Sequence, residues 1–189
     1  MGKNKIRLVI DTCVFIPCGD KNKNIINSIE KFGKELPNLA KRINIVILLS
    51  TEILKEYKSI IRPKIRNCHP LPKFHASFVR NFDRIQLTLG KSKKCVERTI
   101  GKYTFHTIES SKIDKFDVSD FVNDPKDEKF LRLALAEASK GSVFLLSVDN
   151  ASLLRLQTNS SLYKKFCKEF QNANNVKVIL PEKLIDFFI

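Results

Sequence analysis

Two acidic residues stand directly after apolar segments that have the composition of buried strands. Asp11 follows Ile6–Ile10, and Asp149 follows Val143–Val148. In an open α/β sheet, ligand sites form outside the carboxyl ends of the strands. Polar turn residues follow many strands, so one such acid alone would mean little. Two acids at equivalent strand ends favour a shared site, in which both carboxylates could bind one cation.

Further acids are predicted near the starts of two helices. Glu52 and Glu56 lie four residues apart, so they share one face of a helix that follows the strand-like segment Ile43–Leu49. Asp124 and Asp127 lie on either side of a Pro-Lys pair at the start of another helix. That arrangement suits helix capping, in which short acidic side chains accept hydrogen bonds from free backbone N–H groups. A capping role and a ligand role are therefore both open for this pair.

Acids gathered at one sheet edge would need a cation. They would otherwise repel one another and raise each other's pKa values. Oxygen ligands without a His or Cys cluster suit the hard ions Mg²⁺ and Mn²⁺. The five Cys residues include no C-x-x-C pair, which argues against a disulfide scaffold or a zinc ribbon. The acids thus indicate a site for a hard divalent ion, which can activate water and stabilise charge on a phosphoryl group.

The net charge of +14 is concentrated in the middle of the chain. Residues 57–115 hold 14 Lys/Arg and 4 Asp/Glu, whereas residues 116–189 hold 10 of each kind. Such an excess favours a polyanionic partner, and nucleic acid is the commonest one. An acidic membrane surface is the weaker alternative, because no basic amphipathic helix with exposed aromatic residues is evident. The candidate phosphate contacts are six basic side chains: Arg62, Lys64, Arg66, Lys91, Lys93 and Lys94.

Apolar segments alternate with helical patterns along the chain. The predicted strands are Ile6–Ile10, Ile43–Leu49, Val143–Val148 and Val176–Leu180. The predicted helices cover residues 22–36, a segment capped by Ser50 and ended by Pro63, residues 73–100 with a break at Gly90, residues 124–141, one or two segments before residue 176, and a terminal helix from Pro181. Residues 103–123 are ambiguous. The alternation predicts βαβ units and a mainly parallel sheet covered by helices on both faces.

Length and composition predict one globular domain. A chain of 189 residues fits a single domain, and 43% apolar residues suffice for a core. No apolar run approaches the ~20 residues that span a bilayer. The short apolar run after the basic start is stopped by Asp11, which is unlike a secretory signal. We therefore expect a soluble, cytoplasmic protein that does not bind a membrane.

Four segments resemble the PIN-domain nucleases. They are IRLVIDTCVFI from Ile6, LLSTEILKEYKSIIRPK from Leu48, NDPKDEKFLRLALAEA from Asn123 and LLSVDNASLL from Leu145. They are most similar to the subgroup regarded as toxin components of toxin–antitoxin systems, and they leave residues 65–115 largely unmatched. The resemblance implies a three-layer α/β/α sandwich with a central, mainly parallel sheet. Residues 1–189 would form a single PIN-like domain with a basic, largely helical insertion at about 62–115.

The resemblance also implies which residues form the site. Asp124 would be a cap or an outer metal ligand, and the hydroxyl groups of Thr12 and Ser147 would support the site. The family often has a further Asp where this chain has Ala151. One Mg²⁺ or Mn²⁺ ion would therefore be held firmly, whereas binding of a second is in doubt. The implied catalytic and metal-binding residues are Asp11, Glu56, Asp127 and Asp149.

The implied activity is metal-dependent hydrolysis of RNA phosphodiester bonds by an endoribonuclease. The expected partners are RNA, single-stranded or structured, and, for a toxin, a small antitoxin protein; a homodimer and the preferred RNA sequence stay open. One alternative is a non-catalytic PIN-like module for RNA binding or assembly, although the presence of all four acids argues against it. A phosphatase of the haloacid-dehalogenase type is a weaker alternative, because it requires an Asp where this chain has Cys13.

Neutralising Lys91, Lys93 and Lys94 together should make RNA binding less dependent on salt. For single strands, log K falls with log salt with a slope of about −0.7 per phosphate contact, so losing contacts flattens the slope. Binding titrations at several salt concentrations measure this slope, with Mn²⁺ binding as the control that should not change. An unchanged slope would show that these lysines form only a solvated surface.

Overall fold

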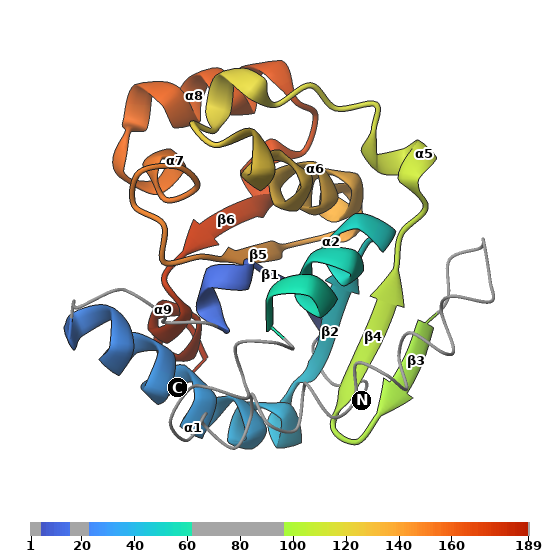
Figure 1. Ribbon diagram of the computed structural model, residues 1–189, viewed down its shortest axis with the longest axis vertical. Coiled ribbons are helices and arrows are strands. Elements are labelled where there is room, and N and C mark those ends of the chain that lie inside the picture. Colours follow the sequence, from blue (N-terminus) through green and yellow to red (C-terminus); the bar gives the residue numbers. More distant parts are fainter. Residues whose placement is uncertain (1–4, 16–22, 62–96, 189) are drawn as a thin grey trace.

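The computed structural model describes residues 5–15, 23–61 and 97–188. In these ranges, six strands form one sheet in the order β3-β4-β2-β1-β5-β6, and every neighbouring pair is parallel except β3 with β4 (Figure 1). The chain is therefore α/β, and the prediction that four segments lie in one mainly parallel sheet is confirmed. The strands are β1 (Lys5–Ile10), β2 (Asn44–Leu49), β3 (Glu97–Ile100), β4 (Tyr103–Thr107), β5 (Val143–Leu146) and β6 (Val176–Ile179).

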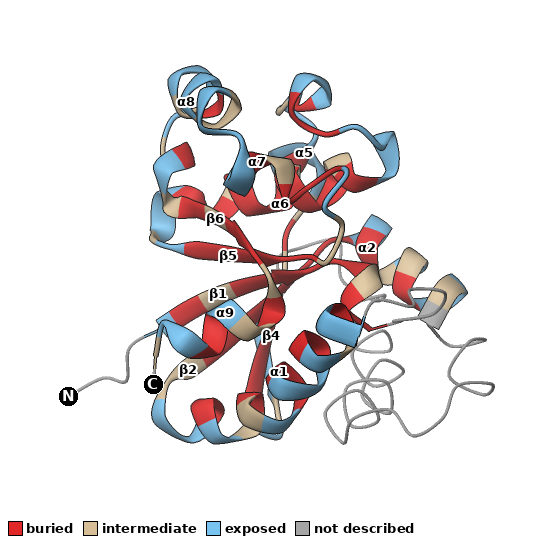
Figure 2. Cartoon of the chain, turned by 90° about the vertical axis from the view of Figure 1, so that its left-hand side faces the viewer, coloured by how far each residue is buried: buried red, intermediate tan, exposed pale blue. Residues whose placement is uncertain are grey.

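Helices lie on both faces of the sheet, in an arrangement compatible with a three-layer sandwich (Figures 1 and 2). On one face, α1 (Lys23–Arg42) packs against α9 (Pro181–Asp186). On the other, α6 (Glu128–Glu137) packs on β1, β2 and β5. None of the helices in the described part of the chain is long and apolar enough to cross a membrane. The remaining α-helices are α2 (Thr51–Glu56), α5 (Ser110–Ile113), α7 (Arg155–Thr158) and α8 (Ser160–Glu169).

The central strands are apolar because helices cover both of their faces. All four side chains of β5 are buried, as are five of the six in β2, and Figure 2 shows the central strands almost entirely as buried residues. The helix after β2 begins as predicted, since the Ser50 hydroxyl accepts a hydrogen bond from the Ile53 backbone at 3.1 Å. It then continues as a π-helical turn over Tyr57–Ile61. Burial on both faces thus accounts for the apolar sequences of β2 and β5, and the Ser50 cap marks the start of the helix after β2.

Two predicted helices have different bounds in the structure. The helix expected at residues 22–36 extends to Arg42, with Pro37 inside it, because Leu39 and Ala40 continue its buried face. The helix expected at 73–100 lies mostly outside the described residues, and its end, Glu97–Ile100, is the strand β3. A tight turn with Gly101 at a φ of 62° reverses the chain there, which a residue with a Cβ rarely allows. The described part of the predicted helical insertion therefore begins as a β-hairpin.

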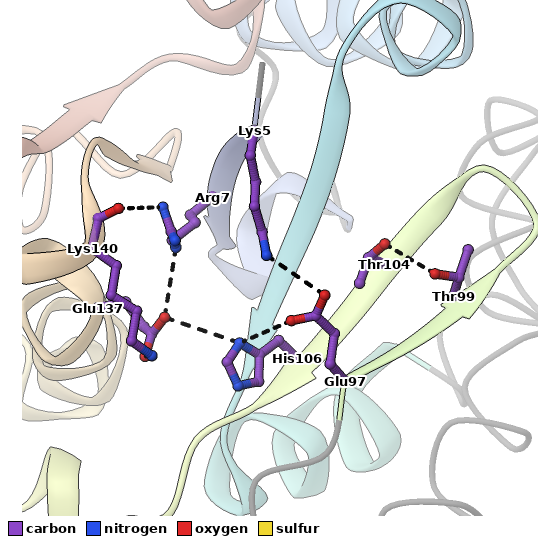
Figure 3. A network of polar contacts seen from close by, with 8 residues as sticks. All are labelled: Lys5, Arg7, Glu97, Thr99, Thr104, His106, Glu137 and Lys140. Atoms are coloured by element: carbon purple, nitrogen blue, oxygen red, sulfur yellow. Dashed lines mark hydrogen bonds and ion pairs between the residues drawn. The ribbon is translucent and has the colours of Figure 1, made fainter. Parts of the chain in front are cut away.

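A network of charged side chains joins this hairpin to the centre of the sheet (Figure 3). Glu137 at the end of α6 is 2% exposed, and its Oε2 lies 3.6 Å from Arg7 Nε and 4.0 Å from His106 Nδ1. Glu97 of β3 lies 3.9 Å from the same His106 nitrogen and 3.5 Å from Lys5 Nζ. Burial lowers the pKa of His106, so the ring is mostly neutral at pH 7. The network connects β1, β3, β4 and α6 through side chains alone.

Replacing Leu8 by Ala should lower the free energy of unfolding by about 2–5 kcal/mol, because Leu8 is fully buried in the central strand β1 and its removal leaves a cavity. Lys164→Ala on the exposed side of α8 is the control, with an expected change within about 0.5 kcal/mol. Urea unfolding followed by circular dichroism measures both. A Leu8 variant as stable as the control would contradict the central position of β1.

Candidate functional site

Asp11 lies at the carboxyl end of β1, where it is 4% exposed. Its Oδ2 accepts hydrogen bonds from the Ser147 hydroxyl at 2.7 Å and from the Cys13 thiol at 2.8 Å. Its Oδ1 accepts a hydrogen bond from the Cys13 backbone at 3.3 Å and so caps the short 3-10 helix Thr12–Val14. Burial raises the pKa of Asp11, and Glu56 adds to the rise. Burial also raises the pKa of the Cys13 thiol, which therefore stays protonated and able to donate.

The end of β5 lies beside the end of β1, because the two strands pair in parallel with Ile10 opposite Leu146. Ser147, which is fully buried, donates to Asp11 and accepts a hydrogen bond from the Asp149 backbone at 3.0 Å. Asp149 is half-buried, and its Oδ1 accepts from the backbones of Ala151 at 2.8 Å and Ser152 at 3.1 Å. The two acids that end apolar strands are thus connected through a single hydroxyl group.

Glu56 reaches the same region from the end of α2. Its Oε1 accepts a hydrogen bond from the Thr12 hydroxyl at 2.5 Å, and its Oε2 lies 2.5 Å from the ammonium of Lys129. Glu56 is half-buried, whereas Glu52, one helical turn earlier, is exposed. The carboxylate of Glu56 therefore has a protein donor on each of its oxygens.

Asp127 and Asp124 have different environments. Asp124 is exposed, and its Oδ1 accepts from the Lys126 backbone at 2.9 Å, which is the geometry of a helix cap. Asp127 is 9% exposed and makes no capping hydrogen bond to α6, and its Oδ2 is buried without a hydrogen-bond partner. Burial raises its pKa to about 6; the Ser152 hydroxyl opposes the rise, and the charges of Asp11, Asp149 and Asp124 add to it. The cap and the buried acid are therefore separate residues.

The structure thus places acids from four segments around one edge of the sheet. The charges of Asp11 and Asp149 help to raise the pKa of Asp127, and the charge of Glu56 helps to raise that of Asp11. Thr12 and Ser147 each donate to one of these carboxylates. Asp124 lies at the rim as a cap. The six predicted phosphate contacts, Arg62, Lys64, Arg66, Lys91, Lys93 and Lys94, lie outside the described residues.

The donor set fits a hard cation. Buried carboxylate oxygens are the ligands that Mg²⁺ and Mn²⁺ prefer, and a buried polar atom without a partner, such as Asp127 Oδ2, is costly to leave unpaired. Among the residues that the structure describes, no three His, Cys, Asp or Glu side chains are already arranged around one point as metal ligands. Two of the acids have other partners: Ser147 and Cys13 donate to Asp11, and Thr12 and Lys129 contact Glu56.

Three contributors to the site were not predicted from the sequence. Cys13 donates to Asp11, and Ser152 accepts from the backbones of Asn123 and Asp124, both at 3.3 Å. Lys129 is buried beside Glu56. A sequence signal exists only for Lys129, which lies four residues before the buried Leu133 and so on the inward face of α6.

The chain matches no protein-family model, and no curated protein is significantly similar to it.

Asp127→Asn should stabilise the metal-free protein at neutral pH. The pKa of Asp127 is raised from 3.8 to about 6, so protonation stabilises the fold at low pH, and this contribution is lost as the pH rises from about 4 to 6. The Asn variant has no such loss and should be more stable at pH 7 by about 1–2 kcal/mol, after a discount for solvent screening.

Thermal melts between pH 4 and pH 8 in the presence of a chelator test this expectation. Asp114→Asn, at an exposed position on α5's end, is the matched control and should leave the pH profile unchanged. If the Asp127 variant follows the wild-type profile, the acid does not experience the buried, negatively charged environment described above.

Proposed function

We propose that the chain is a Mg²⁺- or Mn²⁺-dependent endoribonuclease with a PIN-like domain. The observation that carries the proposal is the unpartnered, buried Oδ2 of Asp127, which lies near Asp11 and Asp149 at the carboxyl edge of the parallel sheet. A buried carboxylate beside other acids destabilises the folded protein unless a cation binds to it. Such destabilising arrangements are expected at functional sites.

Asp127, Asp11 and Asp149 would hold the ion, which when bound lowers the pKa of water and stabilises charge on phosphorus. The chain's own groups orient these acids. Ser147 turns Oδ2 of Asp11 toward β5, and the protonated Cys13 thiol donates to the same oxygen. A thiol held in its protonated form by burial is a poor nucleophile, so water is the group that attacks the phosphodiester.

The basic charge supports an RNA substrate. Residues 57–115 hold 14 Lys/Arg and 4 Asp/Glu, and this excess would attract a polyphosphate strand toward an edge that is itself acidic. The motifs that resemble the toxin subgroup of PIN-domain nucleases extend the proposal to a cytoplasmic toxin with a small antitoxin partner. Within this proposal, the basic residues between positions 62 and 115 bind the RNA.

A non-catalytic RNA-binding module is the second candidate, and one observation favours it. The Lys129 ammonium already neutralises Glu56 inside the acidic group, so part of the charge is balanced without a metal ion. A binding module would keep the basic surface and would not need to bind Mn²⁺ at all. Metal binding therefore separates the two candidates.

Mn²⁺ should raise the melting temperature of the wild-type protein, because an ion that binds only the folded state stabilises it by RT ln(1 + [L]/Kd). The same ion should support cleavage of a mixed-sequence RNA, and a chelator should abolish it. Asp127→Asn and Asp149→Asn should each lose the Mn²⁺ shift and reduce cleavage by about 100-fold or more. Asp114→Asn should retain both properties.

Retention of RNA binding with neither a Mn²⁺ shift nor cleavage in the wild-type protein would establish the binding module instead. RNA binding by filter retention at fixed salt is the measurement that distinguishes this result from a misfolded preparation.

A further inference from the structure

Lys129 is unusual among the lysines in the described ranges because it is buried, with only 5% of its surface exposed. Lysine is almost never buried unless a partner compensates for its charge. Lys129 lies in the first turn of α6, two residues after Asp127. Its ammonium contacts the carboxylate of Glu56 and does not extend into solvent. Its position therefore needs an explanation within the site.

The contacts of Lys129 leave part of its ammonium available. Nζ lies 2.5 Å from Glu56 Oε2 and also donates a hydrogen bond to the Lys126 carbonyl. An ammonium group has three protons to donate. In the part of the chain that the structure describes, these are the polar partners of Nζ, and the Phe130 ring centroid lies 4.8 Å from it. One N–H of the ammonium therefore has no acceptor among the described residues, at a site proposed to bind phosphate.

Glu56 is correspondingly unavailable as a metal ligand. Thr12 donates to one of its oxygens and Lys129 to the other, so a divalent ion would have to displace a buried positive charge to reach it. The chain has Ala151 at the position where PIN-domain nucleases often have a further Asp, so this position supplies no carboxylate for a second ion. The acids left to hold an ion are Asp11, Asp127 and Asp149, and of these Asp127 has an oxygen without a protein partner.

We propose that the Lys129 ammonium permanently supplies, at Glu56, the positive charge that a second divalent ion would otherwise supply. The inference rests on the proposed nuclease function and makes the site a centre of one metal ion and one lysine. The fixed charge holds Glu56 in place and leaves one N–H for a non-bridging phosphate oxygen. An ammonium that donates to phosphate acts as a point charge, which suits a group whose negative charge is delocalised.

The test is the number of Mn²⁺ ions bound, measured by isothermal titration calorimetry and by electron paramagnetic resonance of free Mn²⁺. Wild type should bind one ion per chain. Lys129→Met frees Glu56 and should bind two, whereas Lys129→Met combined with Glu56→Gln should bind one again. Lys129→Arg retains the charge and should bind one. Lys126→Met removes the exposed neighbouring lysine and is the matched control, because only the carbonyl of Lys126 contacts Lys129.

Cleavage provides a second readout. At Mn²⁺ concentrations that fill one site, Lys129→Met should cleave about 100-fold more slowly than wild type, the typical effect of losing one charged donor at a transition state. Raising Mn²⁺ should restore much of that loss in Lys129→Met and none of it in the double variant. Lys126→Met should match wild type. If Lys129→Met does not fold, Lys129→Gln, which keeps a donor but removes the charge, is measured in its place.

The outcomes separate the two proposals. Two ions bound by wild type, or one ion bound by the neutral Lys129 variants with wild-type cleavage, would overturn the role of Lys129 and leave the nuclease intact. Failure of wild type to bind Mn²⁺ would overturn both. One ion in wild type and two in Lys129→Met would support the lysine as the substitute for the second ion.

Discussion

The hydrogen bond from Ser147 to Asp11 is the interaction on which the site depends, because it joins the carboxyl ends of the two central strands. It can form only while β1 and β5 remain parallel and in register, with Ile10 opposite Leu146. The same hydroxyl accepts from the Asp149 backbone, so the loop after β5 takes its direction from β1. A buried apolar sheet thus places polar groups that could not hold one another in place alone.

The site places several carboxylates in a largely buried region, and these carboxylates differ in how many protein donors compensate their charge. Glu56 is compensated by a hydroxyl and an ammonium, and Asp11 by three hydrogen-bond donors. Asp127 retains an oxygen without a partner and has a raised pKa. A fold optimised only for stability would have replaced this carboxylate by an apolar or amide group, because an unpaired buried acid is costly. Within this site, the buried carboxylate oxygen without a protein partner is therefore that of Asp127.

Much of this arrangement could be predicted from the sequence. The apolar run that stops at Asp11 identifies the end of β1, whereas the run to Val148 extends two residues past the end of β5 at Leu146. Parallel pairing then brings the two strand ends together. The β-hairpin was missed because its first strand, β3, is short and carries Glu97 and Arg98, and because the hairpin depends on a turn at Gly101. Lys129 was missed because long charged side chains normally reach solvent. Spacing from Leu133 places it on the inward face of α6, but its partner Glu56 lies on another helix and cannot be identified from that spacing.

The antiparallel strand β3 has a consequence for how the molecule behaves at high concentration. An open sheet edge is a template onto which another chain can add, and charged side chains discourage that addition. Among the described strands β3 lies at one end of the sheet, and its exposed Glu97 and Arg98 discourage such addition. At the other edge, three of the four side chains of β6 are buried and Lys177 is the single charge. Self-association through strand addition would therefore begin at β6.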